Sequence, residues 1–289
     1  ITFAFLGIIA TGYLFFIPES SWKFAISFYA IGVIGFSGGN IFYDSLLVSV
    51  ADISERNKVS SLGFALGYLG GGLLFLFNVM MFSFPSFFGL NSQVEAVLWS
   101  FLSVALWWSI FTLPLLTGIK EPDKSNDHNN FIDVSKKAFK NLYETSQSIS
   151  QYKSAVIFLL AYFLYMDGVD TIIRMAFNIG DNLGFPTEDL LIVLLIVQFI
   201  GVPAALLFSW FSSIITPRNA VLFAIMVYTL ITGFSYFIET KTHIFIFAFF
   251  LGCFQGGIQA ISRSLFARLV PKGKEGEFFL MRFVFNEKI

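Results

Sequence analysis

Eight long apolar stretches, separated by short polar breaks, dominate this chain. They cover about residues 1–17, 24–50, 60–82, 96–118, 154–178, 188–211, 219–238 and 243–267. A helix needs about 20 apolar residues to cross the hydrocarbon core of a bilayer, and only the first stretch is shorter than that. Charged residues make up 13% of the chain, whereas soluble domains carry about 25%. The sequence therefore predicts an all-α membrane protein with about eight transmembrane helices.

Lysine and arginine gather in alternate breaks. Twelve lie in one set of breaks and only two, Lys23 and Lys241, in the other. Because cytoplasmic loops carry an excess of Lys and Arg, we expect the first set to be cytoplasmic, and with it the polar segment 119–152. Apolar residues on one helical face of this segment predict an amphipathic helix on the inner membrane surface, although a plain basic linker fits as well.

Three ionisable residues interrupt the apolar stretch 155–179. Asp167, Asp170 and Arg174 fall within an arc of about 60° if the stretch is one helix. A charge at the bilayer centre costs several kcal/mol, so such residues usually face a bundle interior or a wet cavity. We expect this stripe to face a cavity. The alternative is a structural ion pair between Asp170 and Arg174, which are i, i+4 neighbours.

A short internal repeat links the second and eighth stretches. Residues 35–47 read GFSGGNIFYDSLL and residues 254–266 read FQGGIQAISRSLF, so an offset of 219 pairs Asn40 with Gln259 and Asp44 with Arg263. Two halves related by an axis along the membrane normal are a transporter architecture. We therefore expect helix bundles in 1–118 and 153–289, joined by the cytoplasmic linker 119–152. Asp44 and Arg263 should help to close an inner gate.

Further polar residues share these helices. Gln255, Gln259 and Arg263 follow i, i+4, i+8 spacing, and Gln198 lies in the sixth stretch. They would converge on an aqueous path between the halves, although amides also simply bond neighbouring helices, which is the interpretation we favour for Asn78. The candidate substrate-binding or coupling residues are Asn40, Asp44, Asp167, Asp170, Arg174, Gln198, Gln255, Gln259 and Arg263.

Two stripes of small residues predict close helix packing. Gly63, Gly67 and Gly71 form overlapping GxxxG motifs, and Gly252 and Gly256 form a second stripe. Glycines at this spacing let two helix backbones approach each other in a membrane.

Catalytic and nucleic-acid-binding signatures are absent from the sequence. The two histidines are far apart, and neither HExxH, GxSxG nor GxxxxGK[ST] occurs. The net charge of −1 comes with no basic stripe. We expect no enzyme activity, no metal or other cofactor and no nucleic-acid partner.

Five long segments carry a resemblance to a known family. They are FYDSLL at 42–47, SSLGFALGYLGGGLL at 60–74, FLYMDGVDTIIRMA at 163–176, VQFIGVPAALLF at 197–208, and GGIQAISRSLFARLVP at 256–271 followed by EGEFF at 275–279. The chain resembles the autophagy-linked vacuole-effluxer family of the major facilitator superfamily and its bacterial relatives. The resemblance implies alternating access between two six-helix halves, of whose twelve helices this chain holds the third to the tenth. The sequence after Phe279, LMRFVFNEKI, departs from the Gly-rich continuation of the family.

The predicted function is secondary active transport of a small polar solute across a bacterial inner membrane. In the family that the chain resembles, members in fungal vacuoles are linked to amino-acid efflux, whereas the bacterial relatives mostly lack an assigned substrate. Mixed charges suit a zwitterion such as an amino acid, with Arg263 or Arg174 for its carboxylate and an Asp for its ammonium. Proton coupling through Asp44 or Asp167 is a further hypothesis, since burial moves a carboxyl group toward titration in the working range. The alternative is a non-transporting membrane sensor or scaffold, which would seal these charges inside a packed bundle.

Overall fold

The computed structural model describes residues 1–18, 20–118, 131–271 and 273–286, and within these ranges every regular element is a helix. The longer helices are α1 (Thr2–Tyr13), α2 (Trp22–Ser45), α4 (Arg56–Ser83), α5 (Gln93–Gly118), α6 (Phe131–Ser148), α7 (Lys153–Asn182), α8 (Thr187–Ile215), α9 (Pro217–Ser235), α10 (Lys241–Leu269) and α11 (Glu275–Asn286). Short helices are η1 (Leu14–Phe16), α3 (Leu47–Val50), η2 (Pro85–Phe88) and η3 (Ile149–Gln151).

Seven helical segments in the described ranges are long and apolar enough to cross a membrane. They are Trp22–Val50, which joins α2 and α3, together with α4, α5, α7, α8, α9 and α10. The apolar helix over Thr2–Phe16 is shorter. These segments coincide with the eight apolar stretches, so the predicted all-α membrane fold is confirmed. The division into two bundles at 118 and 153 stays a prediction.

The surface of the bundle has the composition that lipid requires. Large apolar side chains stand exposed along the helices, among them Leu164, Leu207 and Trp210, each more than 60% exposed. A soluble monomer rarely exposes contiguous apolar surface of this extent. A bilayer removes the penalty, because the exposed side chains then contact hydrocarbon.

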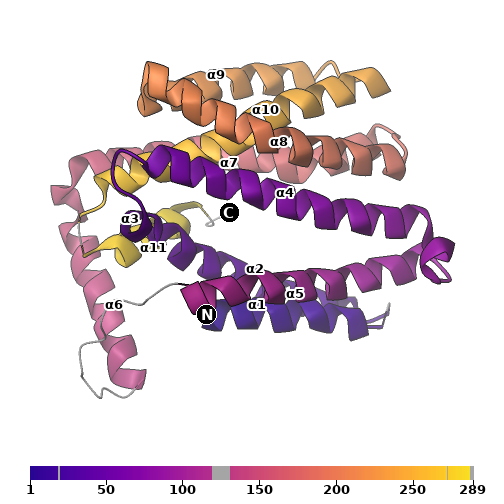
Figure 1. Cartoon of the computed structure of the whole chain (residues 1–289), viewed down its shortest axis with the longest axis horizontal. Coiled ribbons are helices and arrows are strands. Elements are labelled where there is room, and N and C mark those ends of the chain that lie inside the picture. The colour runs from indigo at the N-terminus through magenta and orange to yellow at the C-terminus, as the bar shows by residue number, and fades with distance from the viewer. Residues whose placement is uncertain (19, 119–130, 272, 287–289) are drawn as a thin grey trace.

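Helix α10 lies at the centre of the packing. In the apolar part of α10, 61% of residues are buried, against at most 28% in the other spanning segments. It packs on α7, α8 and α9 and also on α4, whereas α1 packs on α2 and α5 (Figure 1). Residues that belong to α10 therefore sit where the two sets of helices meet.

Small residues permit the closest of these contacts. A Cβ built on Gly35 of α2 would lie 2.4 Å from the backbone nitrogen of Gly7 in α1. Cβ atoms built on Gly252 and Gly256 would lie 3.0–3.2 Å from atoms of α8, which is the close packing that this second stripe predicts.

Segment 119–152 contains the helix α6, which stands outside the bundle beside the end where α3 lies (Figure 1). Lys136 and Lys140 on this helix are exposed. The prediction of a helix in this segment is confirmed, and its contact with a membrane surface stays a prediction. Residues 119–130, which were expected to form the polar start of the linker, lie outside the described residues.

Candidate functional site

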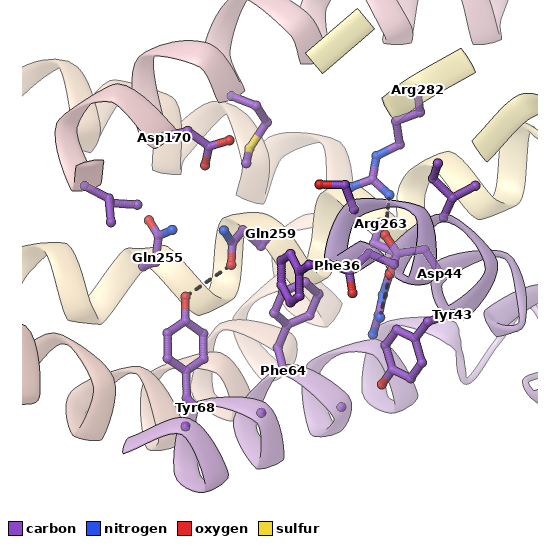
Figure 2. Close-up of a pocket in the computed structure, with 18 of the residues that line it drawn as sticks. Phe36, Tyr43, Asp44, Phe64, Tyr68, Asp170, Gln255, Gln259, Arg263 and Arg282 are labelled. Carbon is purple, nitrogen blue, oxygen red and sulfur yellow. Dashed lines mark hydrogen bonds and ion pairs between the residues drawn. The ribbon is translucent and has the colours of Figure 1, made fainter. Parts of the chain in front are cut away.

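A cavity of about 790 Å³ lies among six helices, α2, α4, α7, α8, α10 and α11 (Figure 2). Eight of the nine predicted site residues line it, namely Asn40, Asp44, Asp170, Arg174, Gln198, Gln255, Gln259 and Arg263. They are separated by up to 223 positions in the chain, and the fold brings them to one space.

Asp167 is the exception, and the prediction that it faces the cavity is wrong. The lining residues of α7 span an arc of about 120°, from Tyr162 to Arg174, and Asp167 falls about 20° beyond its edge. Asp167, Asp170 and Arg174 do lie on one side of α7, but the arc of α7 that faces the cavity is centred between Met166 and Asp170. Arg174 is exposed, and it forms no hydrogen bond or ion pair with another described residue. The alternative prediction, an ion pair between Asp170 and Arg174, is therefore not observed.

Asp44 and Arg263 form an ion pair at one end of the cavity. The guanidinium Nη1 of Arg263 donates to the Oδ1 of Asp44 at 3.0 Å. The same side chain donates from Nε to the hydroxyl of Ser60 and from Nη2 to the Ser60 carbonyl, both at 2.9 Å. Its guanidinium also lies over the ring of Phe64, 4.7 Å from the centroid. The pair joins the two residues that the internal repeat places at equivalent positions.

Arg282 of α11 was not predicted, and it contacts the same carboxylate. Its Nη1 lies 3.3 Å from the Oδ2 of Asp44, and its Nη2 donates to the hydroxyl of Tyr162 at 2.6 Å. Figure 2 shows Arg282 reaching from α11 toward Asp44. The only sequence signal was a single arginine within the apolar run FFLMRFVF, which lies outside the eight apolar stretches.

A seam of hydrogen bonds fastens the start of α4 to the end of α10 beside this ion pair. The Ser60 hydroxyl donates to the Ala260 carbonyl at 2.7 Å, and Arg56 donates to the Ala267 carbonyl at 2.6 Å. The Ser264 hydroxyl donates to Asn57 at 2.5 Å. Ser60, Ser264 and Arg263 are almost completely buried. Beside this end of the cavity, α4 and α10 are therefore held together by buried polar contacts.

Two tyrosine–glutamine pairs lie further along the cavity. The Tyr68 hydroxyl of α4 donates to the Gln259 side-chain oxygen at 3.1 Å, and the Tyr228 hydroxyl of α9 donates to that of Gln255. Asp170 points toward this region from α7 (Figure 2). Because each amide oxygen accepts from a tyrosine, the amide N–H groups remain as donors. This part of the lining can thus bind a polar solute through neutral donors beside one carboxylate.

The glycine stripe of α4 also lines the cavity. Gly63, Gly67 and Gly71 are all lining residues, and a Cβ on Gly67 or Gly71 would meet no atom within 4 Å. The prediction of helix packing is therefore wrong for these two. A Cβ on Gly63 would lie 3.2 Å from Arg263 Nη2, so this glycine leaves room for the guanidinium. The small residues widen the cavity instead of closing a helix interface.

Asn78 behaves as a structural residue. Its side-chain oxygen accepts a hydrogen bond of 2.9 Å from Ser103 of α5, which is the bond between neighbouring helices that we favoured. Gln198, by contrast, faces the cavity from α8. Among the described residues, no three His, Cys, Asp or Glu side chains cluster as metal ligands would.

Comparison with known proteins identifies relatives along the whole chain. The family model "Vacuole effluxer Atg22 like" matches residues 1–286. The chain is 36% identical over 278 residues to YxiO of Bacillus subtilis, described as an uncharacterized MFS-type transporter, and the match covers 96% of this chain and 64% of that protein. It is 27% identical over 299 residues to autophagy-related protein 22 of Saccharomyces cerevisiae, covering 88% of this chain and 55% of that protein.

Another fungal relative gives the same picture. Identity to autophagy-related protein 22 of Kluyveromyces lactis is 25% over 265 residues, which covers 85% of this chain and 51% of that protein. No solved structure matches the chain significantly. The chain thus spans between about half and two thirds of the length of these relatives.

Proposed function

This chain belongs to the vacuole effluxer Atg22 like family of major facilitator transporters, and we propose that the whole protein is a secondary transporter of a small polar solute. The membrane in question is the bacterial cell membrane, as the relation to the Bacillus protein suggests. The solute crosses by alternating access, in which the cavity opens to one side of the membrane at a time.

The observation that carries this proposal is the cavity itself. A volume of about 790 Å³ is of the size of small-molecule sites, which are typically about 300–1,000 Å³. Charged groups inside a membrane bundle are costly and usually mark solute or ion pathways. A sensor or scaffold with sealed charges would need neither the volume nor the exposed guanidinium of Arg174.

We propose amino acids or similar zwitterions as the solute class. A zwitterion needs an acceptor for its ammonium and donors for its carboxylate. The cavity offers the carboxylate of Asp170, the guanidinium of Arg174 and the amides of Gln255 and Gln259 in one lining. Asn40 and Gln198 supply further polar contacts from α2 and α8.

We also propose that the seam near Asp44 and Arg263 is the inner gate. It joins α4 to α10, so the contacts must break if these helices separate at that end. The excess of Lys and Arg in the neighbouring breaks supports a cytoplasmic position for this end. Proton coupling remains part of the proposal, with Asp44 as the carboxylate that lines the cavity.

A solute screen on the full-length protein tests the proposal. Purified protein in proteoliposomes is loaded with unlabelled amino acids and given radiolabelled ones, with and without a pH gradient. We expect exchange of at least one zwitterion, and stimulation by the gradient if protons are coupled. A full-length protein that exchanges no amino acid, sugar or small cation would contradict a transport role.

A further inference from the structure

Two arginines contact the carboxylate of Asp44 at one end of the cavity. Asp44 accepts from Arg263 through Oδ1 at 3.0 Å and from Arg282 through Oδ2 at 3.3 Å. Both arginine side chains are less than 10% exposed, whereas the Asp44 side chain is 23% exposed. Two guanidinium groups thus share one negative charge in a nearly dry place.

The other described residues that line the cavity do not neutralise this excess positive charge. Its only other charged groups are Asp170 and Arg174, which are opposite in sign. The described lining therefore carries three arginines against two aspartates and has a net charge of +1. Because the excess arises where Arg263 and Arg282 meet Asp44, an anion would be most stable there.

The donors for such an anion are present. A guanidinium has five N–H groups. Arg263 uses three of its own on Asp44 and Ser60, and Arg282 uses two on Asp44 and Tyr162. Both residues line the cavity, and their other N–H groups donate to no described residue.

We propose that this end of the cavity binds one small anion of carboxylate type between Arg263 and Arg282, next to Asp44. Planar carboxylates match the fork of guanidinium donors. The inference rests on the proposed function in one respect, since the natural source of the anion is either the carboxylate of the transported solute or a free anion that enters with it. In the first case the solute carboxylate binds at Arg263 and Arg282, in place of the Arg174 guanidinium named under the proposed function.

Acetate is the probe, measured by saturation-transfer NMR on the chain in lipid nanodiscs with empty nanodiscs subtracted. We expect R282Q to raise the apparent Kd of acetate roughly 10-fold or more, as loss of a charge-assisted contact should, and R282K to restore part of the affinity. D44N should act in the opposite direction and tighten acetate binding, since it removes the competing carboxylate. Because D44N predicts a gain, misfolding cannot imitate the result.

Controls and competitors complete the experiment. K241Q removes a cation from the Lys241–Asp189 pair, outside the lining, and should leave acetate binding unchanged. Methylammonium, similar to acetate in size but opposite in charge, should not compete. Free glycine and chloride are then compared as competitors of acetate. If glycine displaces acetate better, the solute carboxylate is the natural source of the anion, and if chloride does, the source is a free anion. Either result supports the site.

Two results would overturn the proposal. One is acetate binding that D44N weakens or leaves unchanged. The other is binding lost in R174Q but retained in R282Q, which would move the anion to Arg174. Since the assay needs no transport, a full-length protein that moves no zwitterion would contradict the proposed function while leaving the anion site intact.

Discussion

Replacing Asp44 by Asn should open the closed end of the cavity. The substitution preserves shape but removes the charge that Arg263 and Arg282 share. In the closed state both guanidinium groups would then lie together in a nearly dry place with no carboxylate between them. In a state in which α4 and α10 have separated, water would solvate both groups. In buffer without an anion that could take the place of the carboxylate, the substitution should therefore destabilise the closed state selectively.

The structure sets the size of this effect. Removal of one partner from a fully buried ion pair costs about 3–5 kcal/mol. The Asp44 side chain is 23% exposed, and Arg263 keeps its bonds to Ser60, so we expect about 2 kcal/mol, which changes the ratio of open to closed states roughly 30-fold.

Labelling of a buried cysteine measures that ratio. Ser264 is fully buried and hydrogen-bonded to Asn57 across the seam, so a thiol at this position reacts with a maleimide only when the seam opens. The test uses S264C in a C253S background, since Cys253 is the only cysteine in the chain. D44N should raise the labelling rate roughly 30-fold. The matched control D189N, which breaks an ion pair outside the cavity, should change it by less than about twofold. Equal rates in D44N and D189N would refute the assignment of Asp44 to a gate.

Three substitutions test other contacts. G35A should lower the thermal unfolding temperature by several degrees, since its Cβ would lie 2.4 Å from the backbone of α1 and overpacking costs about 1–3 kcal/mol. The control G39A, on the same helix, places its Cβ where no atom lies within 4 Å, so it should leave the unfolding temperature unchanged. A G35A protein as stable as G39A would disprove the close approach. Y68F loses the hydrogen bond to its glutamine on α10 and should lose about 1 kcal/mol in denaturant unfolding, whereas Y236F, at an 87% exposed ring, should be neutral; the same loss in both would count against the bond. S61A removes a buried hydroxyl that has no partner among the described residues, so it should stabilise the protein by about 1 kcal/mol, and a destabilised S61A would show that the hydroxyl is bonded after all.

The sequence predicted the helices because each spanning segment satisfies its backbone hydrogen bonds internally, so apolar length alone defines it. It also predicted the contact between Asp44 and Arg263, through a repeat that places both at equivalent positions. That inference needed no packing detail, because residues at equivalent positions beside a two-fold axis lie near each other.

The errors arose where packing decides the outcome. Helical periodicity placed Asp167 on a stripe with Asp170 and Arg174, but it could not say which part of the α7 surface its neighbours α10 and α11 leave uncovered. The glycines of α4 have the spacing of a packing motif, yet at Gly67 and Gly71 the structure places a cavity where a helix could have packed. Arg282 was missed because no periodicity marks a single arginine in a short apolar helix.

The measurement that tests the central claim most directly compares two neighbouring aspartates on α7. Asp170 lines the cavity and Asp167 does not, so D170N and D167N make the same chemical change on either side of the cavity's edge. Both variants of the full-length protein are assayed for exchange of the solute found by the screen, at equal folded protein in proteoliposomes. We predict that D170N weakens solute exchange at least roughly 10-fold, as loss of a charged contact should, and that D167N transports like the wild type. Normal exchange by D170N, or an equal loss in both variants, would contradict the claim that this cavity is the transport site.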